Sequence, residues 1–289
     1  MDTAQLYQAY KPLLFSIAYR MTGSVMDAED IVHEAFITYS KISSVKVIEN
    51  DKAYLCKIVM NSSLDKLGSA ANKREVYVGE WLPEPIVEGD NEPSSMYLMK
   101  ESISIAYLLL LQQLSEVERA VFILREVFQY SYDEIGELVE KSSANCRQIY
   151  HRSKMSITNL PKGSTVDFKS MKNSIEQFTM ALQKGNIDKM LELLRADAIY
   201  IADGGGKVTS ALKPIYTSNR IALLFIGIFK KFPANATVEF CVVNGSPGGV
   251  ISINNTVSYV LSFEFEGDQI ARIYMVANPE KLTHLQIKA

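Results

Sequence analysis

The side chains best suited to recognising another molecule lie between positions 131 and 155. A short helix with apolar residues at Ile135, Leu138 and Val139 is followed by the turn Lys141-Ser142-Ser143, where a serine can cap a second helix. At about 100° per residue, the second helix places Cys146, Ile149, Tyr150 and Ser153 on one side and polar or basic residues on the other. A helix-turn-helix needs this division, because one face packs on the partner helix and the other enters the DNA major groove.

Within this second helix, the position of each polar side chain suggests its role. Donors near the start of the helix can read base edges, and we expect this of Asn145, Arg147 and Gln148. Later residues are better placed to hold phosphates, and these are His151, Arg152 and Lys154. An ordinary helical hairpin with a solvated basic face would show the same pattern. One such module binds DNA weakly, and the net charge is −3, so a second DNA contact or a carrier protein is needed.

A second cluster is acidic. The segment DAEDIVHEAF places Asp27, Asp30 and Glu34 within an arc of about 60° on a helix whose other side is apolar. This arrangement indicates a docking face for a basic partner. The alternative is a solvated face, with acids near the helix start that favour the helix dipole.

A third cluster mixes bases with an aromatic residue. Such a combination can hold single-stranded DNA through charge and stacking, although solvated lysines are the ordinary alternative. The residues concerned are Lys46, Lys52, Tyr54, Lys57 and Asn61.

Composition sets the frame for these clusters. At 289 residues, of which 47% are hydrophobic, the chain is expected to form two or three domains with cores of their own. It begins without a secretion signal and has no apolar run long enough to span a membrane. The three cysteines have neither metal-ligand nor disulfide spacing, so we expect a cytoplasmic protein without a metal site.

The chain divides into four blocks by pattern. Residues 5–74 and 94–160 are helical, and the second of these has capping boxes at Ser115/Glu118 and Ser131/Glu134. A proline-rich linker that contains Trp81 separates them, and a polar hinge at 161–167 follows. The last block has helices, then strands at 197–203, 237–244, 250–253, 256–265 and 269–277, with a helix at 218–232 between the first two strands. This order predicts an α+β domain in which helices cover one face of a curved sheet.

Together these segments resemble the extracytoplasmic-function group of sigma-70 factors over about residues 6–160. DAEDIVHEAF resembles the group's polymerase-binding helix, AYLCKIVMNSSLDKL resembles the helix after its promoter-melting segment, and the stretch from Leu114 to Lys154 resembles the helix-turn-helix that reads the −35 element. The resemblance implies core RNA polymerase and promoter DNA as partners. It assigns the acidic helix to polymerase and the cluster around Lys41 to Asn61 to the −10 element.

A narrower resemblance covers the rest of the chain. YVGEWLPEP (77–85), DGGGK (203–207) and NPEKL (278–282) are similar to three signatures of a subgroup with a SnoaL-like C-terminal domain of the cone-shaped NTF2-like fold. This resemblance implies regulation in cis by that domain, and the regulatory residues it points to are Trp81, Leu82, Pro83, Asp203, Gly204, Gly205, Gly206, Lys207, Asn278 and Pro279.

The expected architecture is therefore multidomain: two all-α sigma domains, the second with the helix-turn-helix, and an α+β NTF2-like domain. The expected boundaries are 1–75 for sigma region 2, 76–93 for the linker, 94–162 for sigma region 4 and 168–289 for the SnoaL-like domain.

The triple glycine suggests a contact. Glycines permit positive φ and close backbone approach, so the stiff WLPEP segment could pack directly on DGGGK and fix the placement of the two DNA-binding blocks. A plain turn and an unattached linker are the alternative.

Two other classes of function compete with the sigma factor. A dimeric repressor with a ligand-sensing domain would bind DNA without polymerase. The sigma-factor hypothesis instead predicts that the free chain is monomeric. NTF2-like cones also include isomerases and cyclases, for which Asp197, Asp203, Tyr200 and Tyr259 are the available acid and base candidates. A structural role suits Asp203 better, because it lies in the turn motif. We expect no catalysis and no cofactor, and we expect that the C-terminal domain could hold an unknown small ligand.

Overall fold

The computed structural model describes residues 3–74, 77–87, 103–157 and 168–288. The chain forms two compact units. The first contains the helices before position 77 together with the helices between residues 116 and 156. The second contains the linker segment 77–87 and all described residues from 168 onward. The hinge expected at 161–167 and linker residues beyond 87 lie outside the described residues.

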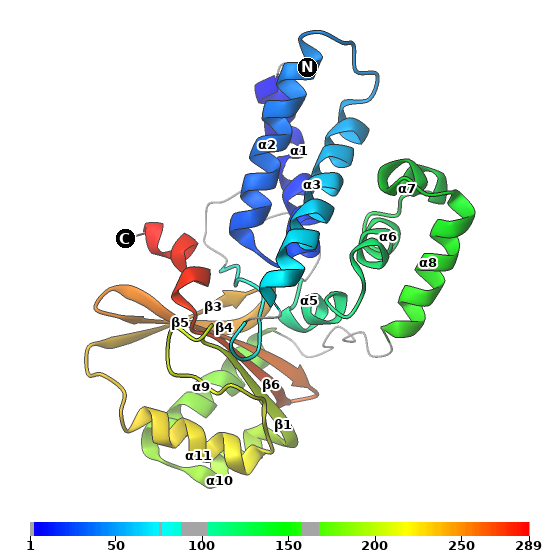
Figure 1. Cartoon of the computed structure of the whole chain (residues 1–289). Helices are drawn as coiled ribbons and strands as arrows, with labels where there is room; N and C mark the ends of the chain where they lie inside the picture. The colour runs from blue at the N-terminus through cyan, green and yellow to red at the C-terminus, as the bar shows by residue number, and fades with distance from the viewer. Residues whose placement is uncertain (1–2, 75–76, 88–102, 158–167, 289) are drawn as a thin grey trace. The chain divides into compact units, whose positions relative to one another are not determined.

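Three long helices begin the first unit: α1 (Thr3–Thr22), α2 (Val25–Ser43) and α3 (Asp51–Arg74). They lie side by side in Figure 1. Their apolar faces meet in a core, with Leu14, Ile17 and Leu55 completely buried. The hydroxyl of Ser24 caps α2 by accepting a hydrogen bond from the Asp27 amide at 3.1 Å, which fixes where the acidic helix begins.

Shorter helices follow: α5 (Ile105–Leu111), α6 (Glu116–Glu126), α7 (Tyr132–Val139) and α8 (Ser143–Ser156). Both predicted capping boxes are present, at Ser115/Glu118 before α6 and at Ser131/Glu134 before α7. Ser142 caps α8 through the Asn145 amide, as the turn sequence predicted. These caps set the short turn between α7 and α8, and so confirm the helix-turn-helix arrangement.

The second unit combines helices with a sheet. Its helices are α9 (Phe168–Lys184), α10 (Ile187–Leu193) and α11 (Ser218–Phe229), followed by the short 3-10 turns η1 (Pro279–Lys281) and η2 (Thr283–Lys288). Its strands are β1 (Leu194–Asp203), β2 (Ile215–Tyr216), β3 (Ala236–Val243), β4 (Ser246–Ile253), β5 (Thr256–Glu266) and β6 (Gln269–Val276). Helices α9, α10 and α11 lie on one side of the sheet in Figure 1, which confirms the predicted α+β layering.

Among the described residues the sheet has the strand order β2-β1-β6-β5-β4-β3. Strands β3 to β6 form the antiparallel meander that the sequence predicted, while β1 runs parallel to β6. The parallel pairing aligns Asp203 at the end of β1 with Val276 at the end of β6. Two sequence motifs that follow these strands are therefore brought to the same edge of the sheet.

Three element boundaries differ from the prediction by more than one residue. Helix α11 ends at Phe229 instead of 232, because a turn and Pro233 follow it. Strand β1 begins at Leu194, three residues early. Strand β4 begins at Ser246 despite Pro247, which pairs only with Val242 of β3 because the pairing with β5 starts at Gly248.

Candidate functional site

Helix α8 presents the two faces that the sequence predicted. Cys146, Ile149 and Ser153 are buried, whereas the predicted DNA contacts Asn145, Arg147, Gln148, His151, Arg152 and Lys154 are all exposed. The helix rests on α6 and α7, with the ring of Tyr150 stacked 6.1 Å from that of Phe122. The exposed face is therefore held on a rigid support and can enter a groove.

The basic side chains of α8 differ in their interaction partners. The Lys154 ammonium lies 3.6 Å from the Glu126 carboxylate, which also accepts a hydrogen bond from the Tyr150 hydroxyl. The Arg147 guanidinium lies over the Tyr132 ring, 5.4 Å from its centroid. The aromatic ring orients Arg147 without neutralising it. Lys154, by contrast, already shares its charge with a carboxylate.

The acidic triad on α2 is divided in a similar way. Lys66 of α3 forms an ion pair of 2.8 Å with Asp27, and this partner, together with Asp30 and Glu34, raises the pKa of the lysine. Asp30 and Glu34 themselves are exposed on α2. The face available to a basic partner therefore consists mainly of Asp30 and Glu34, and Asp27 helps to join α2 to α3.

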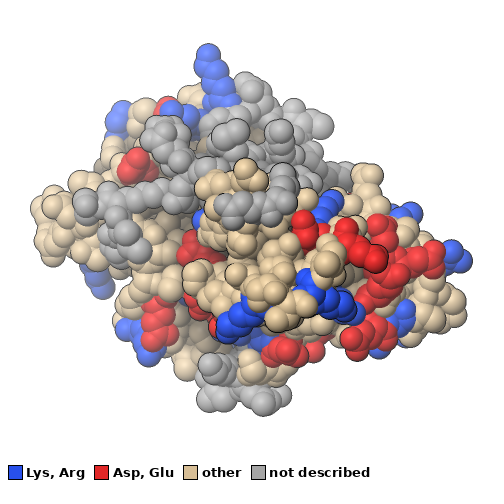
Figure 2. All heavy atoms as spheres, turned by 90° about the horizontal axis from the view of Figure 1, so that it is seen from above, with Lys and Arg blue, Asp and Glu red and all other residues tan. Residues whose placement is uncertain are grey.

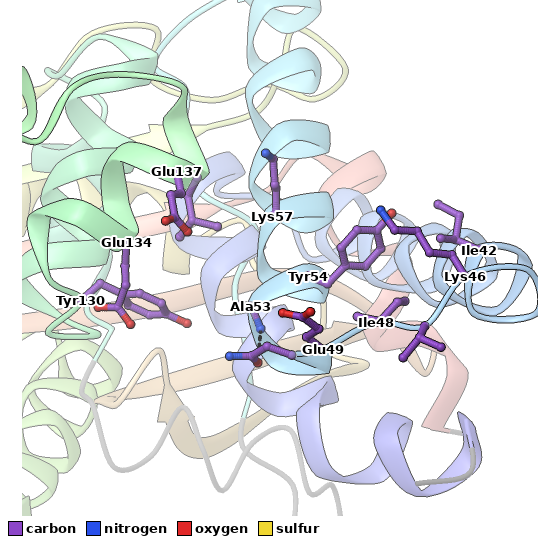
Figure 3. Close-up of a pocket in the computed structure, with 13 residues that line it drawn as sticks. Ile42, Lys46, Ile48, Glu49, Ala53, Tyr54, Lys57, Tyr130, Glu134 and Glu137 are labelled. Atoms are coloured by element: carbon purple, nitrogen blue, oxygen red, sulfur yellow. Dashed lines mark hydrogen bonds between the residues drawn. The ribbon is translucent and has the colours of Figure 1, made fainter.

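The basic and aromatic cluster lines a groove of about 600 Å³ between the α2–α3 connection, α3 and α7. Lys46, Tyr54 and Lys57 lie on the α3 side of the groove in Figure 3, and Glu134 and Glu137 lie on the α7 side. The predicted residues Lys52 and Asn61 also belong to α3 but do not line the groove.

Two interactions of Lys52 link α3 to the start of α7. Lys52 lies 5.8 Å from the centroid of the Tyr130 ring, and its charge helps the Ser131 cap to lower the pKa of Glu134. The exposed acids of α7 are Asp133, Glu134 and Glu137, and the exposed Glu140 follows the helix as its C-cap. In Figure 2 acidic side chains gather on the right, the side on which α6 to α8 lie in Figure 1. The predicted single-strand surface therefore faces an acidic helix of the same unit.

The three C-terminal signatures meet around one carboxylate. Asp203 is completely buried at the end of β1. Its Oδ1 accepts a hydrogen bond of 2.5 Å from the Tyr77 hydroxyl, and its Oδ2 accepts one of 2.8 Å from the Leu82 amide and one of 2.6 Å from Lys281 Nζ. We call this cluster of Tyr77, Leu82, Asp203 and Lys281 the linker latch. It joins the linker to DGGGK and NPEKL, so the predicted contact between WLPEP and DGGGK is present.

Other bonds complete the linker latch. Lys281 Nζ also donates to the Leu82 carbonyl, and the ammonium lies 3.8 Å from the centroid of the Trp81 ring. The Asn278 amide group donates to the Tyr77 hydroxyl at 2.9 Å. Burial, reinforced by the neighbouring Asp203 carboxylate, raises the pKa of Tyr77 above its usual range, so this hydroxyl remains a donor.

Two of the three glycines allow this close approach. Gly205 and Gly206 have φ of +57° and +69°, a region that favours glycine. A Cβ on Gly205 would collide with the Asn278 side chain, and one on Gly206 would lie 3.0 Å from Val78 Cβ. Gly204 instead makes room for Ser210 within its own turn. The next residue, Lys207, forms an exposed ion pair of 3.1 Å with Glu280.

The linker continues along the same domain beyond Leu82. The His284 ring Nε2 donates to the Pro85 carbonyl at 2.8 Å. Asn244 exchanges two hydrogen bonds with Ile86, and Val87 forms an antiparallel bridge with Val243 at the end of β3. Pro83 is buried, whereas Pro279 is exposed in the first turn of η1. Residues 77–87 are thus part of the C-terminal fold.

Sequence reasoning selected most of these residues but missed Tyr77, Lys281, Asn244 and His284. Tyr77 and Lys281 lie inside the motifs YVGEWLPEP and NPEKL, and this position could have identified them as partners of Asp203. A lysine in a motif beside a strand-end aspartate is a candidate buried partner for it.

A separate cavity of about 440 Å³ lies between α9, α11 and the sheet. Two of the four sequence candidates for acid and base chemistry, Tyr200 and Tyr259, line it. Of the other two, Asp197 lies outside the cavity, exposed and paired with Arg195 at 2.8 Å. Asp203 belongs to the linker latch, which agrees with the structural role that its place in the turn motif favoured. Side chains alternate along β1, and Asp197, three residues before Tyr200, falls on the opposite face.

The described residues offer neither a metal site nor a membrane-spanning helix. They contain no cluster of three or more His, Cys, Asp or Glu side chains arranged to hold a metal ion. Within the same ranges, no helix has the length and apolar character needed to cross a bilayer.

Comparisons with known proteins agree with this geometry. Residues 6–73 match the family model of sigma-70 region 2, and residues 104–157 match that of sigma-70, region 4. The helical unit is thus built from sigma-70 domains.

Similarity extends beyond these domains. The chain is 30% identical over 297 residues to the ECF RNA polymerase sigma factor SigJ of Mycobacterium tuberculosis, covering 98% of this chain and 94% of that protein. It is 24% identical to the probable ECF RNA polymerase sigma factor SigI of the same organism, over 97% of this chain and 94% of the relative. The crystal structure of M. tuberculosis SigJ matches with a TM-score of 0.79 and 25% identity, covering 97% of this chain and 98% of that one. The chain belongs to the ECF family of RNA polymerase sigma factors.

The linker latch makes a prediction about stability. Asp203→Ala should lower the free energy of unfolding of the C-terminal unit by about 3–5 kcal/mol, because it leaves Lys281 buried without its carboxylate partner. Urea unfolding followed by the fluorescence of Trp81, the only tryptophan, measures this change where it occurs.

The matched control is the exposed pair between the same two motifs. Lys207→Ala should cost less than about 1 kcal/mol, because solvent screens the Lys207–Glu280 pair. Equal, small effects of the two substitutions would show that the linker latch does not stabilise the unit.

Proposed function

We propose that this chain directs core RNA polymerase to specific promoters and initiates transcription, and that its C-terminal domain regulates it in cis. The observation that carries the proposal is the co-occurrence of an acidic helix, a basic and aromatic helix and a helix-turn-helix in a member of the ECF sigma family. The net charge of −3 supports a carrier, because a chain of this charge with one recognition helix binds DNA weakly alone.

Each surface has a distinct part in this proposal. Asp30 and Glu34 on α2 bind a basic element of polymerase, and the cluster around α3 captures the unpaired strand at the −10 element. Helix α8 reads the −35 element. Polymerase then supplies the affinity that each surface lacks by itself, because linked weak sites act at a high effective concentration. We infer that the protein acts in the cytoplasm and is monomeric before it meets polymerase.

Regulation in cis follows from the course of the chain. The connection from α3 to α5 includes residues 77–87, which are fastened to the C-terminal domain by the linker latch and by the Ile86–Asn244 bonds. We propose that this attachment controls how freely the two sigma regions can separate to reach their promoter elements. Release of residues 77–87 from the C-terminal domain would lengthen the free chain that connects the two sigma regions.

The deciding experiment compares the chain with and without polymerase. In a gel shift, the purified chain should retain promoter DNA only when core polymerase is added. A dimeric repressor would bind without it, and no affinity for core polymerase would overturn the sigma assignment. Run-off transcription with the full chain and with a chain ending at Lys162 should give different output. Equal output would contradict regulation in cis.

The acidic face predicts polymerase affinity. The double substitution Asp30→Asn with Glu34→Gln should weaken binding to core polymerase about tenfold, because it removes two carboxylates that face solvent. The control Glu29→Gln removes an exposed charge on the same helix, about 100° from Asp30 and about 140° from Glu34, and should change affinity less than about twofold. Fluorescence anisotropy of labelled protein measures both. Equal losses would assign the effect to net charge and contradict a specific face.

The two arginines of α8 should fail in different ways. Arg147→Ala should cost about 1–3 kcal/mol at the preferred −35 sequence and relax sequence preference, because forked donors near the helix start read bases. Arg152→Ala should weaken holoenzyme binding evenly across sequences and lower the salt slope by about 1. Filter binding of holoenzyme to a panel of −35 variants at several salt concentrations separates these outcomes. If the two variants behaved alike, the assignment of roles would be wrong.

In the free chain, acidic side chains of α7 should compete with single-stranded DNA for the basic residues of α3. Glu137 lines the groove opposite Lys57, so Glu137→Gln should strengthen binding of the free chain to single-stranded −10 DNA by about two- to fivefold. Binding by the holoenzyme should not change, because the proposed promoter complex separates the two regions. The control Asp133→Asn neutralises an exposed acid of the same helix outside the groove. An equal gain from Asp133→Asn would attribute the effect to general repulsion.

We also propose that the C-terminal domain binds a small molecule in its cavity. The cavity volume lies within the roughly 300–1,000 Å³ range of small-molecule sites, and its lining is mainly aliphatic and aromatic. The same cavity would serve a SnoaL-like isomerase or cyclase, but the placement of Asp197 and Asp203 outside it favours binding.

A further inference from the structure

A packed aromatic group lines the most buried part of the cavity in the C-terminal domain. The Phe225 ring packs in T-shaped geometry against Phe178 and Tyr200, with centroid distances of 5.6 Å and 5.5 Å. Phe178 and Tyr200 are buried, and burial raises the pKa of the Tyr200 hydroxyl, which therefore stays neutral. The inner end thus offers a rigid, uncharged surface to an apolar group.

The other end of the cavity reaches solvent through an apolar rim. Four large side chains of α11 and β3 are exposed there although they line the cavity, and these are Ile228 (41%), Phe229 (38%), Val238 (46%) and Phe240 (37%). Apolar groups left in water at a cavity entrance lower their free energy when a ligand covers them. The occupant should therefore be apolar along its length, from the inner aromatic group to the rim.

The charge at the rim has one sign. Lys231 lines the cavity beside Phe232, and Lys172 lines a smaller adjoining cavity of about 180 Å³ that shares Ile175 and Phe240. Both lysines are exposed, and among the described residues neither has an ion pair or a side-chain hydrogen bond. The described residues that line the two cavities include no aspartate or glutamate. An anionic group at the rim would meet only positive charge.

We propose that the C-terminal domain binds an amphipathic organic acid, with an aliphatic tail between α9, α11 and the sheet and a carboxylate at Lys231. This inference rests on the proposed ligand binding and specifies its chemical class. It explains why a largely apolar cavity has lysines at its mouth, whereas a wholly neutral ligand would need no charged partner there.

The test measures binding to the full-length chain by isothermal titration calorimetry, with dodecanoate and dodecanol as probes below the concentration at which either aggregates. Dodecanoate should bind one per chain and more tightly than dodecanol. Lys231→Gln should weaken dodecanoate about fivefold, the upper end for an exposed ion pair, and leave dodecanol unchanged. The control Lys230→Gln removes the neighbouring lysine, which does not line the cavity, and should change neither affinity.

A second variant tests the location. Ile251→Phe adds volume to a lining residue of β4 and should weaken both probes in a protein whose thermal unfolding is still cooperative. Should dodecanol bind as tightly as dodecanoate, with no effect of Lys231→Gln, the acid class is overturned while ligand binding stands. Absence of binding by both probes, or unchanged binding in Ile251→Phe, would overturn the cavity as the site and with it the ligand proposal. None of these outcomes bears on polymerase binding, which is measured separately.

Discussion

The C-terminal unit depends on one buried charge. A carboxylate taken out of water is costly unless its oxygens are fully bonded, and Asp203 meets this requirement only with groups supplied by two other segments. The linker supplies a hydroxyl and a backbone amide, and the turn after β6 supplies an ammonium. A missing segment would leave the others with unsatisfied polar groups. The association of linker and domain therefore requires all of these hydrogen bonds to form together, which a hydrophobic contact of the same size does not require.

The parallel pairing of β1 with β6 makes this arrangement possible. Asp203 ends β1, and its own carbonyl accepts hydrogen bonds from the Ala277 and Asn278 amides that follow β6. Residues far apart in sequence therefore reach the same edge. The linker then adds the Val87–Val243 bridge beside the edge strand β3, which leaves fewer backbone groups of that strand open to other chains.

Local sequence signals predicted much of this structure. The capping boxes and the serine at 142 predicted where α6, α7 and α8 begin, because a cap depends on residues three apart. Positive φ at Gly205 and Gly206 was expected for the same kind of reason. Properties that depend on long-range pairing were harder to predict. The β1–β6 pairing and the burial of Lys281 depend on contacts across the whole domain, which periodicity does not reveal. The division of the acidic triad by Lys66 was missed because its partner lies on another helix.

The long separation between the parts of the linker latch has a consequence during protein synthesis. Leu82 and Lys281 are 199 residues apart, so at about 5–20 residues per second a ribosome needs roughly 10–40 s to make the second after the first. Asp203 is made 121 residues after Leu82, so the linker first lacks both partners and then still lacks its ammonium partner until Lys281 is made. Until then the helical regions can fold without the complete contact. A newly made chain is therefore in its unrestrained form first, and closure of the contact is a late event in maturation.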